Sequence, residues 1–381
     1  MIVIESKETQ VKTVLNEIKY LRGMQSFLID RRNRNRYTVV VKEDVGYTAY
    51  CFSTPIYNDS SKKLIHLGFE KSKTGFVFDG SNARMTICQN RCVLERKDGA
   101  AVITLDRSPA IRGFNVASTS NITVIPVLNG LKFIVKGNSL KFYLKHTSKQ
   151  EYIRFNPSCF TVMKEEFNPF LSISALYAEN GNGTFSPVEI KYNHQGNQNY
   201  EIQLSHDIPN GQFSFEVNLY EPKLFQDTTV ESIHPDDNNV YGAVGFIGKT
   251  KQHGEQWLYS RPDFSKIPQL TSRVNKVLLH IPILNVSLEN IDVYIPQKRF
   301  CSFGSTWDRR VEMSNKVASS YNDGKYVTID VTAMFAENSN RVLTYNEGLI
   351  FKKPKGKNDS IVISTGDCYS APQILEVQIK S

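Results

Sequence analysis

The alternation of apolar and polar positions predicts a chain built mainly from short β-strands. The clearest case is "GKYVTIDVTAMF", residues 324–335, in which Val327, Ile329 and Val331 fall on every second position. A period of two is typical of a strand with one buried face. We therefore expect a half-buried strand here that delivers these three side chains to a core.

That strand is expected to end at Asp330-Val331-Thr332 and to lead into a short helical turn. Thr332 suits the N-cap because its hydroxyl can accept a hydrogen bond from a free amide of the turn, and the carboxylate of Asp330 can do the same. Residues 333–335, Ala-Met-Phe, would then pack the turn under the sheet, before a polar run begins.

One helix is expected ahead of the strands, in residues 7–23. Its apolar side chains are spaced to fall near one stripe, at Val11, Val14, Leu15, Ile18 and Leu21. Gly23 is a suitable C-cap because glycine adopts the left-handed conformation that ends many helices.

Beyond this helix, short apolar runs alternate with Gly, Asn, Asp, Ser and Pro turns, a pattern typical of sandwiches or barrels. The predicted strands lie in residues 36–43, 46–58, 74–89 (two strands joined across Asp-Gly-Ser-Asn), 100–105, 122–128, 131–137, 139–146, 172–178, 188–193, 200–206 and 213–221. No repeat of about 20–50 residues indicates a solenoid or propeller. The predicted fold class is all-β, with tandem β-sandwich or jelly-roll-like domains and one short N-terminal helix.

Changes in the pattern of predicted strands and turns along the sequence predict two domain boundaries. A joint near 148–152 would separate an N-terminal β-sandwich with its leading helix, residues 1–150, from residues 151–222. The latter are interpreted as a domain of β-hairpins, or as a continuation of the first domain, because three tight polar turns follow one another. A second joint near 222–226 would begin the last domain, residues 223–381.

Composition and charge exclude some classes of function. The 381 residues are 40% hydrophobic and 22% charged, which is enough apolar material for a packed core. The six cysteines are too few for a disulfide framework. The net charge is +8, but its densest basic cluster, residues 30–37, is interpreted as a solvated turn because no series of stacking aromatics accompanies it. We therefore do not expect nucleic acid as a partner.

The N-terminus lacks the basic start and apolar run of a signal peptide, and no apolar run reaches the length of a transmembrane helix. The expected location therefore stays open between the cytoplasm, release by lysis or within a particle, and the cell surface if a leader has been removed.

The last third of the chain resembles a known family through the order of several short segments. These segments are "FQDTTVESIHPDDNNVYG" at 225–242, "WLYSRPDFSKIPQL" at 257–270, "VNKVLLHIPIL" at 274–284, "YVTIDVTAMF" at 326–335, "NEGLIFKK" at 346–353 and "APQILEVQI" at 371–379. The series is similar to the DNRLRE-type β-sandwich module, a carbohydrate-binding-module-like family of bacterial multidomain proteins. The resemblance implies a β-sandwich with a binding role. The motif behind the family name is absent, as is the tryptophan that often follows Asp-Val-Thr, and the resemblance does not cover residues 1–150.

Catalytic patterns are missing from the sequence. It contains no GxSxG, HExxH, Walker loop or GxGxxG. His206-Asp207 stands just before Pro209 and is interpreted as part of a turn, because a triad also requires a placed nucleophile. We therefore expect a protein that is not an enzyme.

A calcium site is one candidate for bound chemistry. The segment "HPDDNNVYG", residues 234–242, gathers Asp236, Asp237 and Asn239, and calcium prefers such oxygen ligands. A plain Asx turn explains the same residues. A structural Ca²⁺ is thus the only cofactor that the sequence suggests.

A ligand-binding loop is the second candidate. In "CSFGSTWDRR", residues 301–310, Trp307 is followed by Asp308, Arg309 and Arg310. An exposed indole can cover the apolar face of a sugar ring, and a guanidinium can hold hydroxyls or a carboxylate with paired hydrogen bonds. The alternative is that Trp307 closes the end of the core. Trp257, which opens an apolar strand, is expected to be core.

Three functions remain in competition. The first is a non-catalytic modular β-sandwich protein that binds glycan or another cell-surface polymer and acts in adhesion. The second is a structural component of a phage-like tail or other bacterial particle, which we would expect to be a homo-oligomer. The third is an unrecognised hydrolase.

Overall fold

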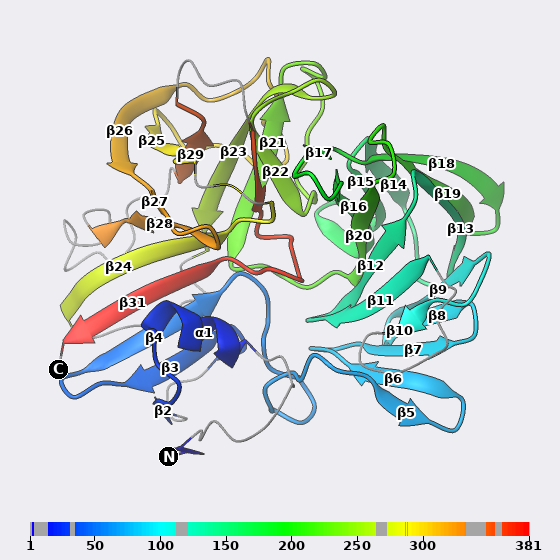
Figure 1. Ribbon diagram of the computed structural model, residues 1–381, viewed down its shortest axis with the longest axis horizontal. Coiled ribbons are helices and arrows are strands. Elements are labelled where there is room, and N and C mark those ends of the chain that lie inside the picture. The colour runs from blue at the N-terminus through cyan, green and yellow to red at the C-terminus, as the bar shows by residue number, and fades with distance from the viewer. Residues whose placement is uncertain are drawn as a thin grey trace. The chain divides into compact units, whose positions relative to one another are not determined.

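The computed structural model describes residues 2–3, 14–30, 35–111, 121–263, 273–285, 287, 289–332, 348–354 and 360–380. The chain divides into two compact units. Unit 1 consists of Met1–Tyr57, Pro222–Val240 and Val244–Ser381, and unit 2 of Asn58–Glu221 and Tyr241–Ala243. Unit 2 is thus mainly an insertion between two parts of unit 1 (Figure 1).

The first sheet of unit 1 joins the two ends of the chain. In spatial order its antiparallel strands are β1 (Ile2–Val3), β2 (Leu28–Asp30), β3 (Thr38–Lys42), β4 (Tyr47–Phe52), β31 (Ile374–Lys380), β24 (Arg273–Pro282), β28 (Tyr326–Asp330) and β27 (Tyr321–Asn322). The central pair β4 and β31 sets Ala49 opposite Val377 and Cys51 opposite Leu375. These four side chains are buried.

The second sheet of unit 1 is formed by the C-terminal half of the chain. Its order is β26 (Met313–Ser319), β25 (Asp292–Pro296), β29 (Leu349–Lys352), β23 (Gly254–Pro262), β22 (Val244–Thr250) and β30 (Ile361–Ser364), and β21 (Phe225–Glu231) also pairs with β23. Side chains of the two sheets share one buried cluster, which includes Val277 and Ile329 from the first and Leu258, Phe351 and Ile363 from the second. Unit 1 is therefore a β-sandwich.

Unit 2 also contains two sheets. One has the order β10 (Ala110–Ile111), β11 (Ile122–Val127), β12 (Gly130–Lys136), β20 (Gln212–Leu219), β16 (Asn168–Glu179), β15 (Cys159–Glu165) and β14 (Tyr152–Asn156), with β17 (Phe185–Ser186) beside β16. The other has the order β18 (Glu189–Gly196), β19 (Asn199–Ser205), β13 (Ser139–His146), β9 (Gly99–Leu105), β8 (Arg91–Arg96), β7 (Arg84–Cys88), β6 (Gly75–Asp79) and β5 (Glu70–Ser72).

Stacked aromatic rings join the two sheets of unit 2. The ring of Phe215 on β20 lies between those of Phe133 and Phe142, with centroid distances of 4.7 and 5.6 Å. Phe142 reaches this core because burial along β13 alternates strictly, as its sequence pattern predicts. The all-β fold class expected from the sequence is confirmed.

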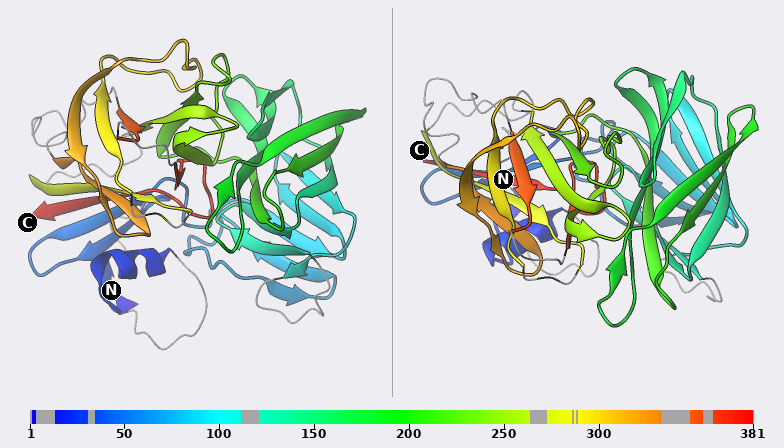
Figure 2. Two further views of the ribbon diagram at one scale, coloured as in Figure 1. Left: turned by 45° about the horizontal axis from the view of Figure 1, so that its top comes forward. Right: turned by 90° about the horizontal axis from the view of Figure 1, so that it is seen from above.

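The predicted helix is present as α1 (Leu15–Arg22), and residues 7–13 lie outside the described residues. Leu15 and Ile18 are its buried side chains. The helix ends at Gly23, whose φ of 62° is left-handed and whose N–H bonds the carbonyls of Lys19 and Tyr20, as expected of a glycine cap. Figure 2 shows α1, in dark blue, beside the blue strands of the first sheet from two further directions.

The strand expected around residue 327 is β28. Val327, Ile329 and Val331 are all buried in the core of unit 1. The Thr332 hydroxyl accepts a hydrogen bond from the Val277 amide at 2.9 Å, so it joins neighbouring strands. Asp330 accepts the Thr332 amide at 3.0 Å. The Ala-Met-Phe turn at 333–335 lies outside the described residues.

The predicted division at residue 150 is wrong. Strand β13 ends at His146 and pairs with β19, which begins at Asn199, so one sheet continues across the expected joint. Residues 1–57 belong with the C-terminal part because β4 pairs with β31. The chain re-enters unit 1 at Pro222, where the second joint was expected. The pattern of apolar and polar residues did not reveal these pairings, because it reports only local alternation and not which strands pair.

Among the described residues, no helix has the length and apolar character that crossing a membrane requires.

Candidate functional site: a Glu-His-His cluster beside the Trp307 loop

Three potential metal ligands converge at one end of the second sheet of unit 1. Glu231 is the last residue of β21, His234 lies in the turn that follows, and His253 lies in the turn between β22 and β23. One ligand atom from each lies within 4.8 Å of the other two. Within the described residues this is the one group of three or more His, Cys, Asp or Glu side chains that meets such a criterion.

The Glu231 carboxylate is at the centre of the cluster. Its Oε1 lies 2.6 Å from Nδ1 of His234, and its Oε2 lies 2.7 Å from Nδ1 of His253. Gln256 on β23 donates a hydrogen bond from Nε2 to Oε2 at 3.0 Å, and its own Oε1 accepts the Phe246 amide. Gln256 therefore holds the carboxylate in its orientation. Residues that hydrogen-bond to metal ligands without touching the metal commonly have this role.

Burial separates the two histidines. His253 is 3% exposed, and neither of its ring nitrogens makes a hydrogen bond of normal geometry with the described residues. The short Nδ1 contact to Glu231 is thus an ion-pair contact with poor hydrogen-bond alignment. The His234 side chain is 37% exposed. Water or an ion could therefore reach the cluster on the His234 side.

Electrostatics keep the central carboxylate ionised. Burial acts to raise the pKa of Glu231, but the contacts to His253 and His234 outweigh it and hold that pKa below its usual value. In contrast, burial and the neighbouring Glu231 raise the pKa of Asp237. The cluster thus offers one carboxylate and two imidazoles.

This donor set suits a transition metal better than calcium. Two imidazole nitrogens and one carboxylate are ligands of zinc with an open fourth position, whereas calcium takes oxygen ligands. Bonds of about 2 Å place the ligands of a tetrahedral zinc roughly 3.3 Å apart. The two Glu–His contacts, at 2.6 and 2.7 Å, would have to lengthen slightly, and a metal would then replace them.

The predicted calcium residues lie in the adjoining turn. Asp236 is exposed and Asp237 is half-buried. Asn239 is buried, and its amide donates to the Thr229 carbonyl at 3.4 Å. The Asp237 carboxyl interacts electrostatically with Glu231 and His234. Its backbone amide donates a hydrogen bond to the His234 carbonyl at 3.0 Å, which closes the turn.

Hydrogen bonds bring the two sequence candidates together. The Asn238 side chain donates to the carbonyls of Ser302 and Ser305 at 2.6 and 2.7 Å. The Asp308 amide bonds the Pro235 carbonyl at 3.2 Å. The turn 232–240 is therefore fastened to the loop 301–310, although about sixty residues separate them in the sequence.

Trp307 is partly packed against the core and partly exposed to solvent. It is half-buried and packs on the apolar cluster around buried Trp257, with 5.2 Å between the ring centroids. The guanidinium of Arg310 lies 4.7 Å from the Trp307 ring and donates to the Trp307 carbonyl at 2.6 Å. Arg310 thus holds the indole in place, while Asp308 and Arg309 are exposed. Trp257 is buried, as predicted.

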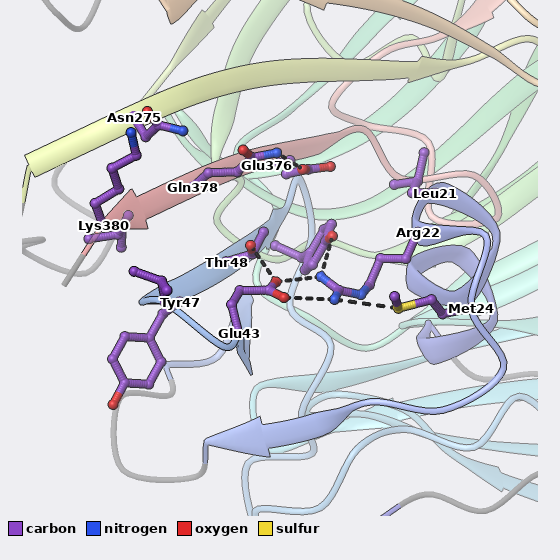
Figure 3. Close-up of a pocket in the computed structure, with 13 residues that line it drawn as sticks. Leu21, Arg22, Met24, Glu43, Tyr47, Thr48, Asn275, Glu376, Gln378 and Lys380 are labelled. Atoms are coloured by element: carbon purple, nitrogen blue, oxygen red, sulfur yellow. Dashed lines mark hydrogen bonds and ion pairs between the residues drawn. The ribbon is translucent and has the colours of Figure 1, made fainter.

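A separate pocket of about 440 Å³ lies in unit 1 between α1 and the first sheet (Figure 3). Arg22 closes one end of it, and Lys380 and Asn275 lie toward the other end. The Arg22 guanidinium binds both oxygens of Glu43, at 2.5 and 2.9 Å, and Thr48 donates to Glu43 at 2.7 Å. These bonds fasten the end of α1 to the sheet.

The Arg22–Glu43 pair gives the first testable prediction. The hydrogen bonds from Arg22 hold the pKa of Glu43 below its usual value against the effect of burial. A carboxyl with a depressed folded-state pKa stabilises the fold above its unfolded pKa, about 4.3, and this stabilisation is lost as pH falls through the folded pKa. Glu43→Gln should therefore be less stable than wild type at pH 7, and denaturant titrations should show the difference shrinking toward pH 3.

The matched control is Asp79→Asn, because Asp79 forms a long, exposed ion pair with Arg84 at 3.9 Å. This substitution should change stability little at either pH. A Glu43→Gln difference that is independent of pH would refute the electrostatic role of the pair.

The sequence reasoning missed Glu231, His234 and His253 as a group. His234 and Glu231 lie within or just before the segment that drew attention for its aspartates. His253 lies nineteen positions after His234, in an unremarkable turn. Only the register of β21 on β23, which sets Glu231 opposite Gln256, brings these turns together.

Comparison with models of known protein families finds none that matches the chain. Comparison with curated proteins finds no relative. The likeness of residues 225–381 to the DNRLRE-type module therefore stays a prediction from the sequence.

Proposed function

We propose that unit 1 is a non-catalytic binding module for carbohydrate or a cell-surface polymer, with its binding loop at residues 301–310. The observation that carries this proposal is the fastening of that loop by Asn238 and Pro235, which leaves Asp308 and Arg309 exposed beside a held indole. A fixed loop loses little conformational entropy when it binds, so preorganisation favours a recognition role.

The side chains of the loop would contact a sugar in different ways. The exposed area of Trp307 offers an apolar surface to a sugar ring, and Arg309 and Asp308 offer a hydrogen-bond donor fork and an acceptor. Arg310 is a positioning residue because its guanidinium already bonds the Trp307 carbonyl and stacks on the ring. Covering part of one ring contributes about 1–3 kcal/mol, so we expect weak affinity for a single sugar.

The Glu-His-His cluster gives the module a second component. A metal held by Glu231, His234 and His253 would order the turn 232–240, and this turn carries the Pro235 and Asn238 contacts to the binding loop. We propose a transition metal in a structural role here, with Ca²⁺ on Asp236, Asp237 and Asn239 as the competing assignment. The link predicts that metal and glycan binding reinforce each other.

A glycan array followed by calorimetry tests the proposal. Wild-type protein should bind at least one glycan class, and Arg309→Ala should weaken that binding several-fold with a melting temperature close to wild type, because exposed substitutions change stability little. The matched control is Arg107→Ala, an exposed arginine beside Asp106 in unit 2, which should bind as wild type does.

Trp307→Ala gives a second measurement on the same loop. It should lose glycan binding and also some stability, because the indole packs on Trp257 and Arg310. A wild-type protein that binds no glycan, combined with a destabilised Trp307→Ala, would leave Trp307 as core and refute the module's proposed ligand. A stable trimer or larger assembly in light scattering would then favour a particle component.

A further inference from the structure

A second cluster of reactive side chains is buried in unit 1, where the chain enters β21. Lys223 lies two residues before β21, Asp227 lies within it, and Asp367 follows β30. Lys223, Asp227 and Asp367 are only 5%, 2% and 8% exposed. Burying one lysine and two aspartates costs several kcal/mol per ion unless their charges are compensated. The cluster therefore calls for a chemical explanation.

The contacts hold the amine against one carboxyl. Lys223 Nζ lies 3.3 Å from Oδ1 of Asp367 and 3.5 Å from the ring centroid of Tyr369, which covers it. Near-attack geometry requires reacting atoms about 3–3.5 Å apart. The 3.3 Å contact is to Oδ1, which is bonded to Cγ, so the carbon that the amine would attack lies one bond beyond the contacted oxygen.

The second aspartate is fixed beside the first. Asp227 Oδ2 accepts the Gly366 amide, and its carboxyl interacts with that of Asp367. The backbone at Gly366 approaches so closely that an added Cβ would lie 2.8 Å from Asp227 Oδ2. Glycine at this position therefore lets the segment before Asp367 lie directly on β21.

The two carboxyls are placed to share one proton. Burial and the neighbouring Asp367 raise the pKa of Asp227 well above its usual value, and burial also raises that of Asp367 although Lys223 opposes the rise. No described donor faces Oδ1 of Asp227, so this oxygen can carry the proton and pass it to Asp367. Asp227 is placed to move protons at the reacting carboxyl.

We propose that Lys223 and Asp367 join in an intramolecular amide bond, with Asp227 as the proton relay. The geometry that carries this inference is an amine, an acceptor carboxyl and a second acid within one dry cluster. It is independent of the binding loop and of the Glu-His-His cluster.

The reaction balances without a co-reactant. The Lys223 ammonium first gives a proton to the acid pair and becomes a neutral amine. Its Nζ then attacks Cγ of the protonated Asp367, so that the Nζ–Cγ bond forms and one Cγ–O bond breaks. Asp227, which is protonated at this stage, gives its proton to the departing hydroxyl and takes the second proton from nitrogen. The ammonium loses two protons, the leaving oxygen gains two, and one water is released.

The surroundings favour the product. Proximity replaces a bimolecular encounter by an intramolecular one, and the amide removes the buried ion pair between Lys223 and Asp367. Tyr369 and the surrounding buried side chains exclude the water that would hydrolyse the bond. The cross-link would join the entry to β21 with the segment that leads into β31, and would so restrict the unfolded chain.

Intact mass spectrometry of the purified, denatured full-length protein is the direct test. Wild type should be lighter than its sequence mass by one water. Trypsin should fail to cut after Lys223, so the peptide 192–249 should stay joined to the peptide 358–380. Fragmentation should place the branch between Lys223 and Asp367.

Variants assign the roles. Lys223→Arg and Asp367→Ala should both restore the full sequence mass and the separate peptides. After purification, most molecules of Asp227→Asn should still have the full sequence mass. On incubation they should lose water at least tenfold more slowly than wild type. The matched control is Lys353→Arg, because Lys353 is the other buried lysine with an acidic neighbour in the described part of unit 1, 3.5 Å from Glu289. It should keep the water loss.

The wild-type measurement alone can overturn the proposal, even if some variants fail to fold. A folded wild type at its full sequence mass would show that the cluster is an ordinary buried ion pair. A water loss that persists in Lys223→Arg, or that maps to other residues, would also refute it. A normal rate in folded Asp227→Asn would remove the proton relay.

Discussion

Deleting residues 1–57 is expected to unfold unit 1 while unit 2 stays folded. Strands β3 and β4 lie in this segment, and β4 forms a continuous antiparallel ladder with β31 from Tyr47 to Phe52. The deletion also removes four members of the main core of unit 1, Tyr37, Val40, Ala49 and Cys51. Each large buried side chain contributes about 2–5 kcal/mol. Losing these side chains together with the β3 and β4 ladders therefore removes an amount comparable with the total stability of an ordinary domain, about 5–15 kcal/mol.

Tryptophan fluorescence can follow unit 1 alone in this experiment. Both tryptophans of the chain, Trp257 and Trp307, lie in unit 1. The variant 58–381 should lose its cooperative fluorescence transition in urea and show red-shifted emission from the start. Circular dichroism should still report a strand-rich unfolding transition from unit 2. The full-length protein, with both transitions, is the control.

The same reasoning applies to residues 223–381 on their own. The sequence suggests that this fragment folds as a domain, but in the structure it leaves β31 without β4. We expect the fragment to aggregate, because an exposed apolar strand edge is a site for pairing with other chains. Fusing residues 1–57 to residue 222 through a short linker should improve its folding, since Leu224 already bonds the Ser53 carbonyl at 2.8 Å. A cooperative transition in the fragment alone would contradict this role of β4.

Zinc is expected to stabilise unit 1 through the Glu-His-His cluster. A ligand at a hundred times its dissociation constant raises the free energy of unfolding by about 2.7 kcal/mol. Metal-free protein should therefore melt at a higher temperature after zinc is added, and a chelator should reverse the change. The effect should weaken below about pH 6, because imidazole must be neutral to bind a metal.

His234→Ala is the informative variant, because His234 is partly exposed and its loss leaves the core intact. This variant should fold and lose the zinc-dependent rise. The matched control is His66→Ala, an exposed histidine in unit 2, which should keep it. Calcium is tested in parallel: a calcium-dependent rise that Asp236→Ala or Asp237→Ala abolishes would favour the oxygen site. Melts that neither metal changes would leave the cluster as a hydrogen-bonded structural group.

The stabilisation that Glu231 contributes is expected to decrease as the pH falls. Its pKa is held below the usual value by the two histidines. The stabilisation from Glu231 is therefore present above the pKa of an unfolded glutamate and is lost as pH falls through the folded value. In metal-free protein, the stability difference between wild type and Glu231→Gln should shrink on acidification.

The sequence by itself determined the elements and the direction of their side chains. Period-two alternation placed Val327, Ile329 and Val331 in a core, and the same alternation along Ser139–His146 appears as alternating burial. Gly23 fixed the end of α1. These features are local, because a strand presents alternate side chains to opposite faces whichever strand lies beside it.

The sequence also selected the loops of the candidate site but not its chemistry. It pointed to residues 234–242 for their aspartates and to residues 301–310 for Trp307. Glu231 and His253 join His234 only through strand register. Lys223 and Asp367, 144 positions apart, meet only where the segment after β30 lies on β21.

The tertiary structure alone decided which strands are partners. Residues 1–57 lie in one sheet with the last strand, and a complete two-sheet unit is inserted between them and Pro222. Nothing in β4 marks β31 as its neighbour, since any apolar strand with the same alternation would offer the same hydrogen bonds and a similar face. The choice is made by the fit of all strands around one core, which is a property of the folded chain as a whole.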